Sequence, residues 1–104
     1  MTYRMPTDFV VMDNLFLILW GAWTAAGSFD VRISFGQPGE AYNVHTLLVN
    51  VGAVMVLDQL TSVDLVPPFA ALLANLVAND VVLVNVKNVS VNRHNVVGID
   101  GRYS

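Results

Sequence analysis

The side chains that could carry out chemistry are few in this sequence and are not grouped. The chain of 104 residues has no Cys, which excludes thiol nucleophiles, disulfides and thiolate zinc sites. Its histidines, His45 and His94, lie far apart, and neither has a carboxylate beside it at a metal-ligand spacing. No nucleophile elbow, phosphate-binding loop or dinucleotide-binding glycine pattern occurs. We therefore expect no enzyme, no catalytic residue, no cofactor and no metal site.

The composition is unusually poor in charge. Only 12% of residues are charged, against roughly 25% in an ordinary domain, and 55% are apolar. This composition is the opposite of a disordered chain, and a net charge of −3 offers no basic surface for nucleic acid. A chain of this length forms one domain at most. Because so few charges would coat a monomer in water, we predict that lipid covers its apolar middle.

Long uncharged runs at 14–29, 41–57 and 65–79 indicate which segments would lie in lipid. A membrane-spanning helix needs about 20 apolar residues, with roughly 17 as the lower limit. We therefore predict a mainly α fold, a single small membrane domain over 1–104. Two transmembrane helices would cover about 10–29 and 43–57. A third span or an interfacial helix would cover 66–79, with Pro67 and Pro68 at its start.

Small residues in the first predicted span favour close helix packing. Gly21 lies four residues before Ala25, as Ala22 does before Ala26, so each pair would share one helix face. In the second span, Asn50 would bond to a neighbouring helix. The many β-branched residues of 44–57 would instead favour a buried strand in water, so helix and strand both stay open there. The first segment could also be a secretory signal, but its acidic N-terminal flank argues that it is retained.

Two other segments show the period of a strand. Apolar residues alternate with polar ones between Phe29 and Phe35, and Pro38-Gly39 after them predicts a turn. A similar alternation begins at Val81. We predict a polar-faced β tail over 81–104, with a turn at 92–95 and a return strand from Val96.

Together the span at 15–29, the span at 44–57 and the tail at 81–104 resemble the small lattice-forming membrane proteins of lipid-containing icosahedral bacteriophages of the corticovirus kind. The resemblance implies many copies in the internal membrane of a virion or in the host inner membrane. The expected function is that of a viral structural protein, an integral membrane protein that packs with other copies of itself. It would also contact a second membrane protein or the coat protein of the capsid shell. No site residue carries over from the resemblance.

Two alternatives remain from other functional classes. The first is a holin-like pore-former, which short apolar spans and tight loops would suit. The second is a soluble, obligately oligomeric α+β interaction domain. Its Val-rich segments would be strands buried against identical neighbours, as obligate interfaces permit.

Overall fold

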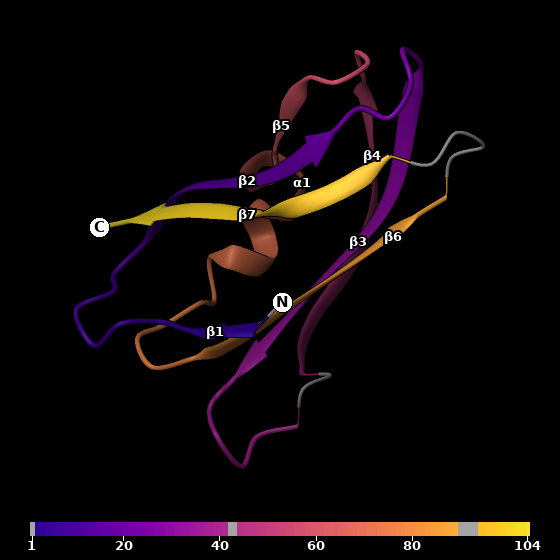
Figure 1. Cartoon of the computed structure of the whole chain (residues 1–104). Coiled ribbons are helices and arrows are strands. Elements are labelled where there is room, and N and C mark those ends of the chain that lie inside the picture. The colour runs from indigo at the N-terminus through magenta and orange to yellow at the C-terminus, as the bar shows by residue number, and fades with distance from the viewer. Residues whose placement is uncertain (1, 42–43, 90–93) are drawn as a thin grey trace.

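The computed structural model describes residues 2–41, 44–89 and 94–104. Seven strands and one short helix make up the regular structure of these residues (Figure 1). In chain order they are β1 (Thr2–Arg4), β2 (Met12–Trp20), β3 (Ala26–Gly36), β4 (His45–Val54), β5 (Leu60–Asp64), α1 (Val66–Leu73), β6 (Val81–Asn88) and β7 (Asn95–Tyr103).

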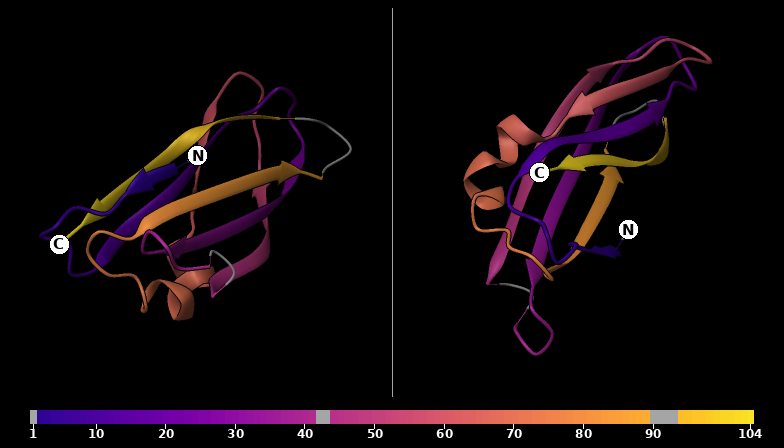
Figure 2. Two further views of the ribbon diagram at one scale, coloured as in Figure 1. Left: turned by 90° about the horizontal axis from the view of Figure 1, so that it is seen from below. Right: turned by 90° about the vertical axis from the view of Figure 1, so that its left-hand side faces the viewer.

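The strands form two antiparallel sheets that face each other across one core. One sheet has the order β1-β6-β3-β4 and the other the order β5-β2-β7. The core contains the inward side chains of the two central strands: Leu15, Leu17 and Leu19 from β2, and Phe29, Val31, Ile33 and Phe35 from β3. The two views of Figure 2 show the layers together with α1.

The strand pairs are nested within one another along the chain. β3 pairs with β4, β2 pairs with β5 around that hairpin, and β1 pairs with β6 around both. All three pairs are antiparallel, so the chain folds like one long hairpin wrapped into two layers. This is the winding of a jelly-roll sandwich. The next pair in the series would join β7 to a strand preceding β1, and no described strand takes that position.

The predicted strand at 29–35 is confirmed. It lies within β3, where Phe29, Val31, Ile33 and Phe35 are all at most 1% exposed. Their polar neighbours point to the opposite face, because successive side chains of a strand alternate. The predicted turn at Pro38-Gly39 is confirmed as well, and Gly39 has a positive φ of 93°.

The predicted mainly α membrane fold is wrong. The first predicted span, 10–29, forms β2, a loop and the start of β3, and the second, 43–57, contains β4. No helix in the described part of the chain combines the length and the apolar character needed to cross a bilayer. The predicted transmembrane helices at 10–29 and 43–57 are therefore wrong.

The physical reason for this correction is visible in β2. Its side chains alternate between the core and the outer face, with Leu17 fully buried and Ile18 half-buried next to it. Both sets are apolar, so the strand contains an uncharged run like that of a lipid-facing helix. For β4, the β-branched residues behave as the strand alternative anticipated, because β3 supplies a partner over ten residue pairs.

A helix in the third predicted segment is confirmed, although it is much shorter than 66–79. It begins with prolines in its first turn and spans only eight residues. Phe69 and Leu73 are buried, and the helix contacts β2 and β4. In the right-hand view of Figure 2, α1 lies on one side of the molecule and β1 on the other. One face of the helix therefore packs against the protein core.

Strands in the predicted tail are confirmed, but their pairing is not the predicted hairpin. β6 joins β3 and β1 in the four-stranded sheet, whereas β7 pairs with β2 in the other sheet. The connection between β6 and β7 thus crosses from one layer to the other. Of the turn predicted at 92–95, residues 92 and 93 lie outside the described residues.

Candidate functional site

The outer face of the three-stranded sheet is apolar along its central strand. Phe16, Ile18 and Trp20 of β2 point outward, away from the core side on which Leu17 is buried. The register places Leu60 of β5 opposite Trp20, and Leu60 is 69% exposed. We call Phe16, Ile18, Trp20 and Leu60 the outer apolar face.

The outer face of the four-stranded sheet is polar along its central strand, β3, by contrast. Ser28, Asp30 and Arg32 alternate with the buried residues of β3 and point outward. Asn50 of β4 donates hydrogen bonds to the Ser28 hydroxyl and the Asp30 carboxylate, both at 2.9 Å. A sandwich in water normally has polar outer faces. Only one sheet of this molecule follows that rule, so the outer apolar face needs another explanation.

Two joined loops at one end of the sandwich (Figure 1) carry further exposed apolar side chains. The loop after β2 and the turn after β4 are held together by hydrogen bonds from Gly21 N to Gln59 O and from Asp58 N to Gly21 O. Leu57 N also donates to the Thr24 hydroxyl at 3.1 Å. Trp23, 60% exposed, lies in the first of these loops, and Leu57, 51% exposed, in the second.

The five predicted packing residues lie in strands and loops, and none is in a helix. Gly21 is in the loop after β2, where an added Cβ would lie 2.2 Å from Val56 O. Ala22 and Ala25 are in the same loop, and the Ala25 carbonyl accepts a hydrogen bond from Met55 N. Ala26 begins β3. Asn50 bonds within its own sheet.

The two histidines have structural surroundings. His94 is 5% exposed, and its Nδ1 accepts a hydrogen bond from Ala22 N at 3.2 Å, so it holds the loop after β2. His45 stacks on Phe35 with 5.0 Å between ring centroids. Its Nε2 lies 4.0 Å from a Glu40 carboxylate oxygen.

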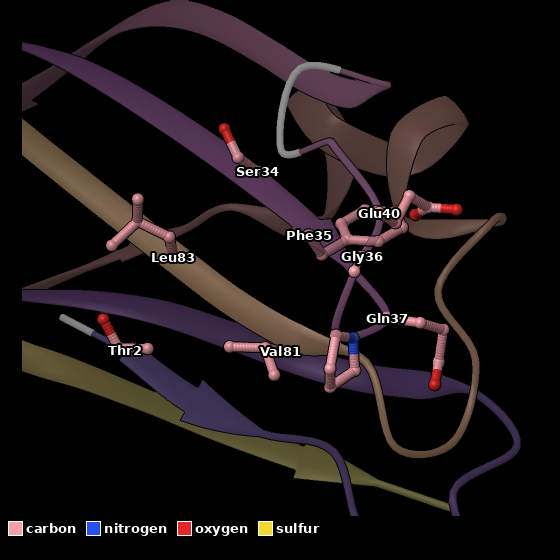
Figure 3. A pocket seen from close by; sticks show the side chains of 10 residues that line it. Thr2, Ser34, Phe35, Gly36, Gln37, Glu40, Val81 and Leu83 are labelled. Carbon is pink, nitrogen blue, oxygen red and sulfur yellow. The ribbon is translucent and has the colours of Figure 1, made fainter.

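A hollow of about 400 Å³ lies at the end of the four-stranded sheet where β3 leaves it (Figure 3). Its walls are Thr2, Val81 and Leu83 on one side and the segment from Ser34 to Glu40 on the other. The Ser34 and Thr46 hydroxyls are hydrogen-bonded to each other at 2.8 Å. Glu40 is the only charged residue among the described residues that line the hollow. These residues thus offer a single carboxylate and no nucleophile paired with a base.

A buried carboxylate anchors the loop beside this hollow. Asp80 is 3% exposed and accepts hydrogen bonds from Gln37 Nε2 at 2.6 Å and from Val77 N at 2.9 Å. Among the described residues, no group of three or more His, Asp or Glu side chains could hold a metal ion. Asp80 therefore has a structural role.

Asp80→Ala should lower the free energy of unfolding by about 1–3 kcal/mol, because it leaves the Val77 N–H without its acceptor and removes one of the two acceptors of the Gln37 amide. Asp80→Asn retains one acceptor oxygen and should cost less. Urea unfolding of both variants measures the difference. Equal stability of Asp80→Ala and the unaltered protein would contradict the anchoring role.

A second hollow, about 320 Å³, opens between the two sheets on the side away from α1. We call it the side groove. Its lining is almost wholly apolar and joins the edges of both sheets through Tyr3, Met5, Met12, Ile99, Gly101 and Tyr103.

Burial raises the pKa of the Tyr3 phenol above its usual 10.0. The unfolded chain releases this proton at a lower pH than the folded protein, so stability is retained below about pH 10 and falls as the pH rises through the folded-state pKa. Tyr3→Phe should remove this part of the alkaline loss. Urea unfolding of both proteins at pH 9 and at pH 11 measures it, and identical alkaline losses would contradict the assignment.

The fold and the surface together define an antiparallel two-sheet sandwich of jelly-roll winding with one exposed apolar sheet face. No family model matches the chain, and no curated protein or solved structure matches it either. The outer apolar face was missed by the sequence analysis. The signal for it was present, because 15–20 is apolar at odd and at even positions alike.

Proposed function

We propose that the protein is a structural interaction module that works as an oligomer of its own copies. The observation that carries the proposal is the outer apolar face: β2 is apolar on both of its faces, and no described element of the chain covers the outer one. The proposal keeps the structural role and the self-association expected from the sequence and places them on a sheet surface.

The comparison between the two sheets supports this proposal. Both sheets belong to one small domain and share its low charge, yet the outer face of one sheet is polar along its central strand and that of the other is apolar there. Large exposed apolar patches on small proteins mark interaction sites, whereas single apolar residues do not. Trp20 and Trp23 add aromatic area of the kind enriched where proteins bind each other.

Identical copies are the partners that this surface favours. An interface between permanently associated subunits is more apolar than a transient one. It removes apolar area from contact with water, which a surface poor in charge needs. The chain has five basic and eight acidic residues in 104. Burying the outer apolar face between copies would leave the polar face of the other sheet in contact with water.

Light scattering over a concentration series, in buffer without detergent, tests the proposal. We expect dimers or larger assemblies in the unaltered protein. Ile18→Lys, at the centre of the outer apolar face, should weaken association by about tenfold or more, because it would bury an unpaired charge. Leu48→Lys is the matched control, since Leu48 is 51% exposed on the outer face of the other sheet.

In that control, association should remain within about threefold of the unaltered protein, a shift of less than 1 kcal/mol. A folded, monodisperse monomer at all concentrations would overturn the proposed function. So would equal effects of the two lysine substitutions.

A further inference from the structure

The outer edge of β7 is the unfilled position of the nested strand series. β7 pairs with β2 on one side, and no described strand pairs with it on the other. It is nine residues long and mostly exposed. Such an edge presents unpaired backbone groups that can add a strand from another chain. We expect the added strand to run antiparallel to β7, because all strand pairs among the described residues are antiparallel.

The side groove lies directly beside this edge. Ile99, Gly101 and Tyr103 line it from β7, and Tyr3 lines it from β1. An added strand would therefore complete a backbone ladder and also cover apolar side chains between the sheets. The C-terminal half of β7, from Ile99 to Tyr103, is where both features coincide.

The charges of β7 identify the strand that fits. Asp100 and Arg102 are two residues apart and share the outer face of the strand. A second β7, related by a two-fold axis at Gly101, runs antiparallel and sets Asp100 opposite the partner's Arg102. The symmetry repeats the pair, so two ion pairs form across the interface.

On the inner side of the same register, Ile99 lies opposite the partner's Tyr103. An aromatic and a β-branched side chain form a favourable cross-strand pair. With the axis at Ile99 instead, Asp100 would face Gly98 and Arg102 would face Val96, and neither charge would find a partner. The register centred on Gly101 alone pairs both charges and places the contact at the side groove.

We propose that two copies of this protein pair through the outer edges of their β7 strands, with the two-fold axis at Gly101. The two three-stranded sheets then become one continuous sheet. The proposal rests on the proposed function, self-association, and adds a second contact to the one through the outer apolar face, because edge pairing leaves that face uncovered and continues it over both copies.

Cysteine cross-linking tests the register, because the chain has no Cys of its own. In Gly101→Cys, the two Cα atoms would lie about 4.5–5.5 Å apart across the axis, within the reach of a disulfide. The site accepts a side chain, since the nearest atom to an added Cβ is 3.6 Å away. We expect a covalent dimer under mild oxidation.

Gly98→Cys is the matched control on the same strand, and nothing lies within 4 Å of its added Cβ. In the proposed register residue 98 lies opposite the partner's residue 104, so the two sulfurs introduced by Gly98→Cys would be separated by about 20 Å along the strands. We expect no cross-link. Cross-linking of both variants to the same extent, or of Gly98→Cys alone, would overturn the proposal.

Charge reversal provides a second test that needs no cysteine. Asp100→Arg or Arg102→Asp alone sets like charges opposite each other and should raise the dimer Kd by about tenfold. The double variant with both changes restores the pairs with reversed polarity and should return within about threefold of the original Kd. A double variant as weak as the single ones overturns the proposal.

The outcomes separate this proposal from the proposed function. In one outcome, light scattering detects oligomers although Gly101→Cys forms no covalent dimer and charge reversal leaves the Kd unchanged. That result overturns the β7 pairing and leaves self-association in place. A monomer at every concentration overturns both.

Discussion

Leu17→Ala is expected to lower the free energy of unfolding by about 2–5 kcal/mol, whereas Ile18→Thr should change it by about 1 kcal/mol or less. Leu17 is fully buried between the two sheets, so its truncation leaves a cavity lined by core residues. Ile18 is half-buried on the outer face, and threonine keeps its β-branched shape there. Substitutions at two neighbouring residues of one apolar run should therefore differ strongly in their effect on the free energy of unfolding.

Chemical unfolding of both variants, followed by circular dichroism in buffer without detergent, measures this contrast. The comparison distinguishes the alternation of a strand from the environment of a lipid-embedded helix. A similar cost for both substitutions would contradict the placement of β2 in the sandwich. Ile18→Thr should also weaken self-association, so the unfolding measurements are made at one fixed protein concentration.

Gly21→Ala is expected to lower the free energy of unfolding by about 1–3 kcal/mol. An added Cβ would lie 2.2 Å from Val56 O and 2.9 Å from Val56 C, and both are backbone atoms. Neither can move without displacing the turn after β4. The backbone hydrogen bonds that join Gly21 to Gln59 and Asp58 would be disturbed together with the packing.

Gly98→Ala is the control for this prediction, because an added Cβ there meets nothing within 4 Å. Its stability should stay within about 0.5 kcal/mol of the unaltered protein. Thermal unfolding gives the stabilities, and tryptophan fluorescence reports on the loops, since Trp20 and Trp23 flank Gly21. If both alanine variants were equally stable, the close approach of the two loops would be contradicted.

The elements predicted correctly are those that have a local signal in the sequence. β3 alternates Phe29, Val31, Ile33 and Phe35 with polar residues, so its period of two is visible in the sequence. The prolines at the start of α1 similarly mark a helix, because proline is tolerated in the first turn. In both segments, residues adjacent in the sequence are enough to indicate the type of element.

The elements predicted wrongly are apolar on both faces or rich in β-branched residues. In β2 the two sets of alternating side chains are both apolar, so the sequence shows no period of two. The length of the uncharged run is close to that of a membrane-spanning helix, and it therefore predicted one. In β4 the β-branched residues favoured a strand only if a partner strand existed. That partner, β3, is recognised only once the chain is folded.

The candidate sites show the same difference between what local sequence indicates and what only the folded chain brings together. Gly21 was singled out as a small residue for close packing between helices, and the structure places it against the backbone of another loop. The outer apolar face and the side groove combine residues from distant parts of the chain, such as Leu60 with Trp20 and Tyr3 with Ile99. Sheet register brings these residues together, and no local spacing indicates it.

By itself, the sequence determined the scarcity of charge, the absence of thiol chemistry, the strand at 29–35, the helix start at Pro67 and the β character of the tail. Only the tertiary structure decided that the apolar runs cover a protein core, which strands pair, and which apolar side chains remain outside. The physical reason is that burial of an apolar side chain is favourable in any apolar environment. Composition therefore shows that a segment avoids water, and only the folded arrangement shows what it packs against.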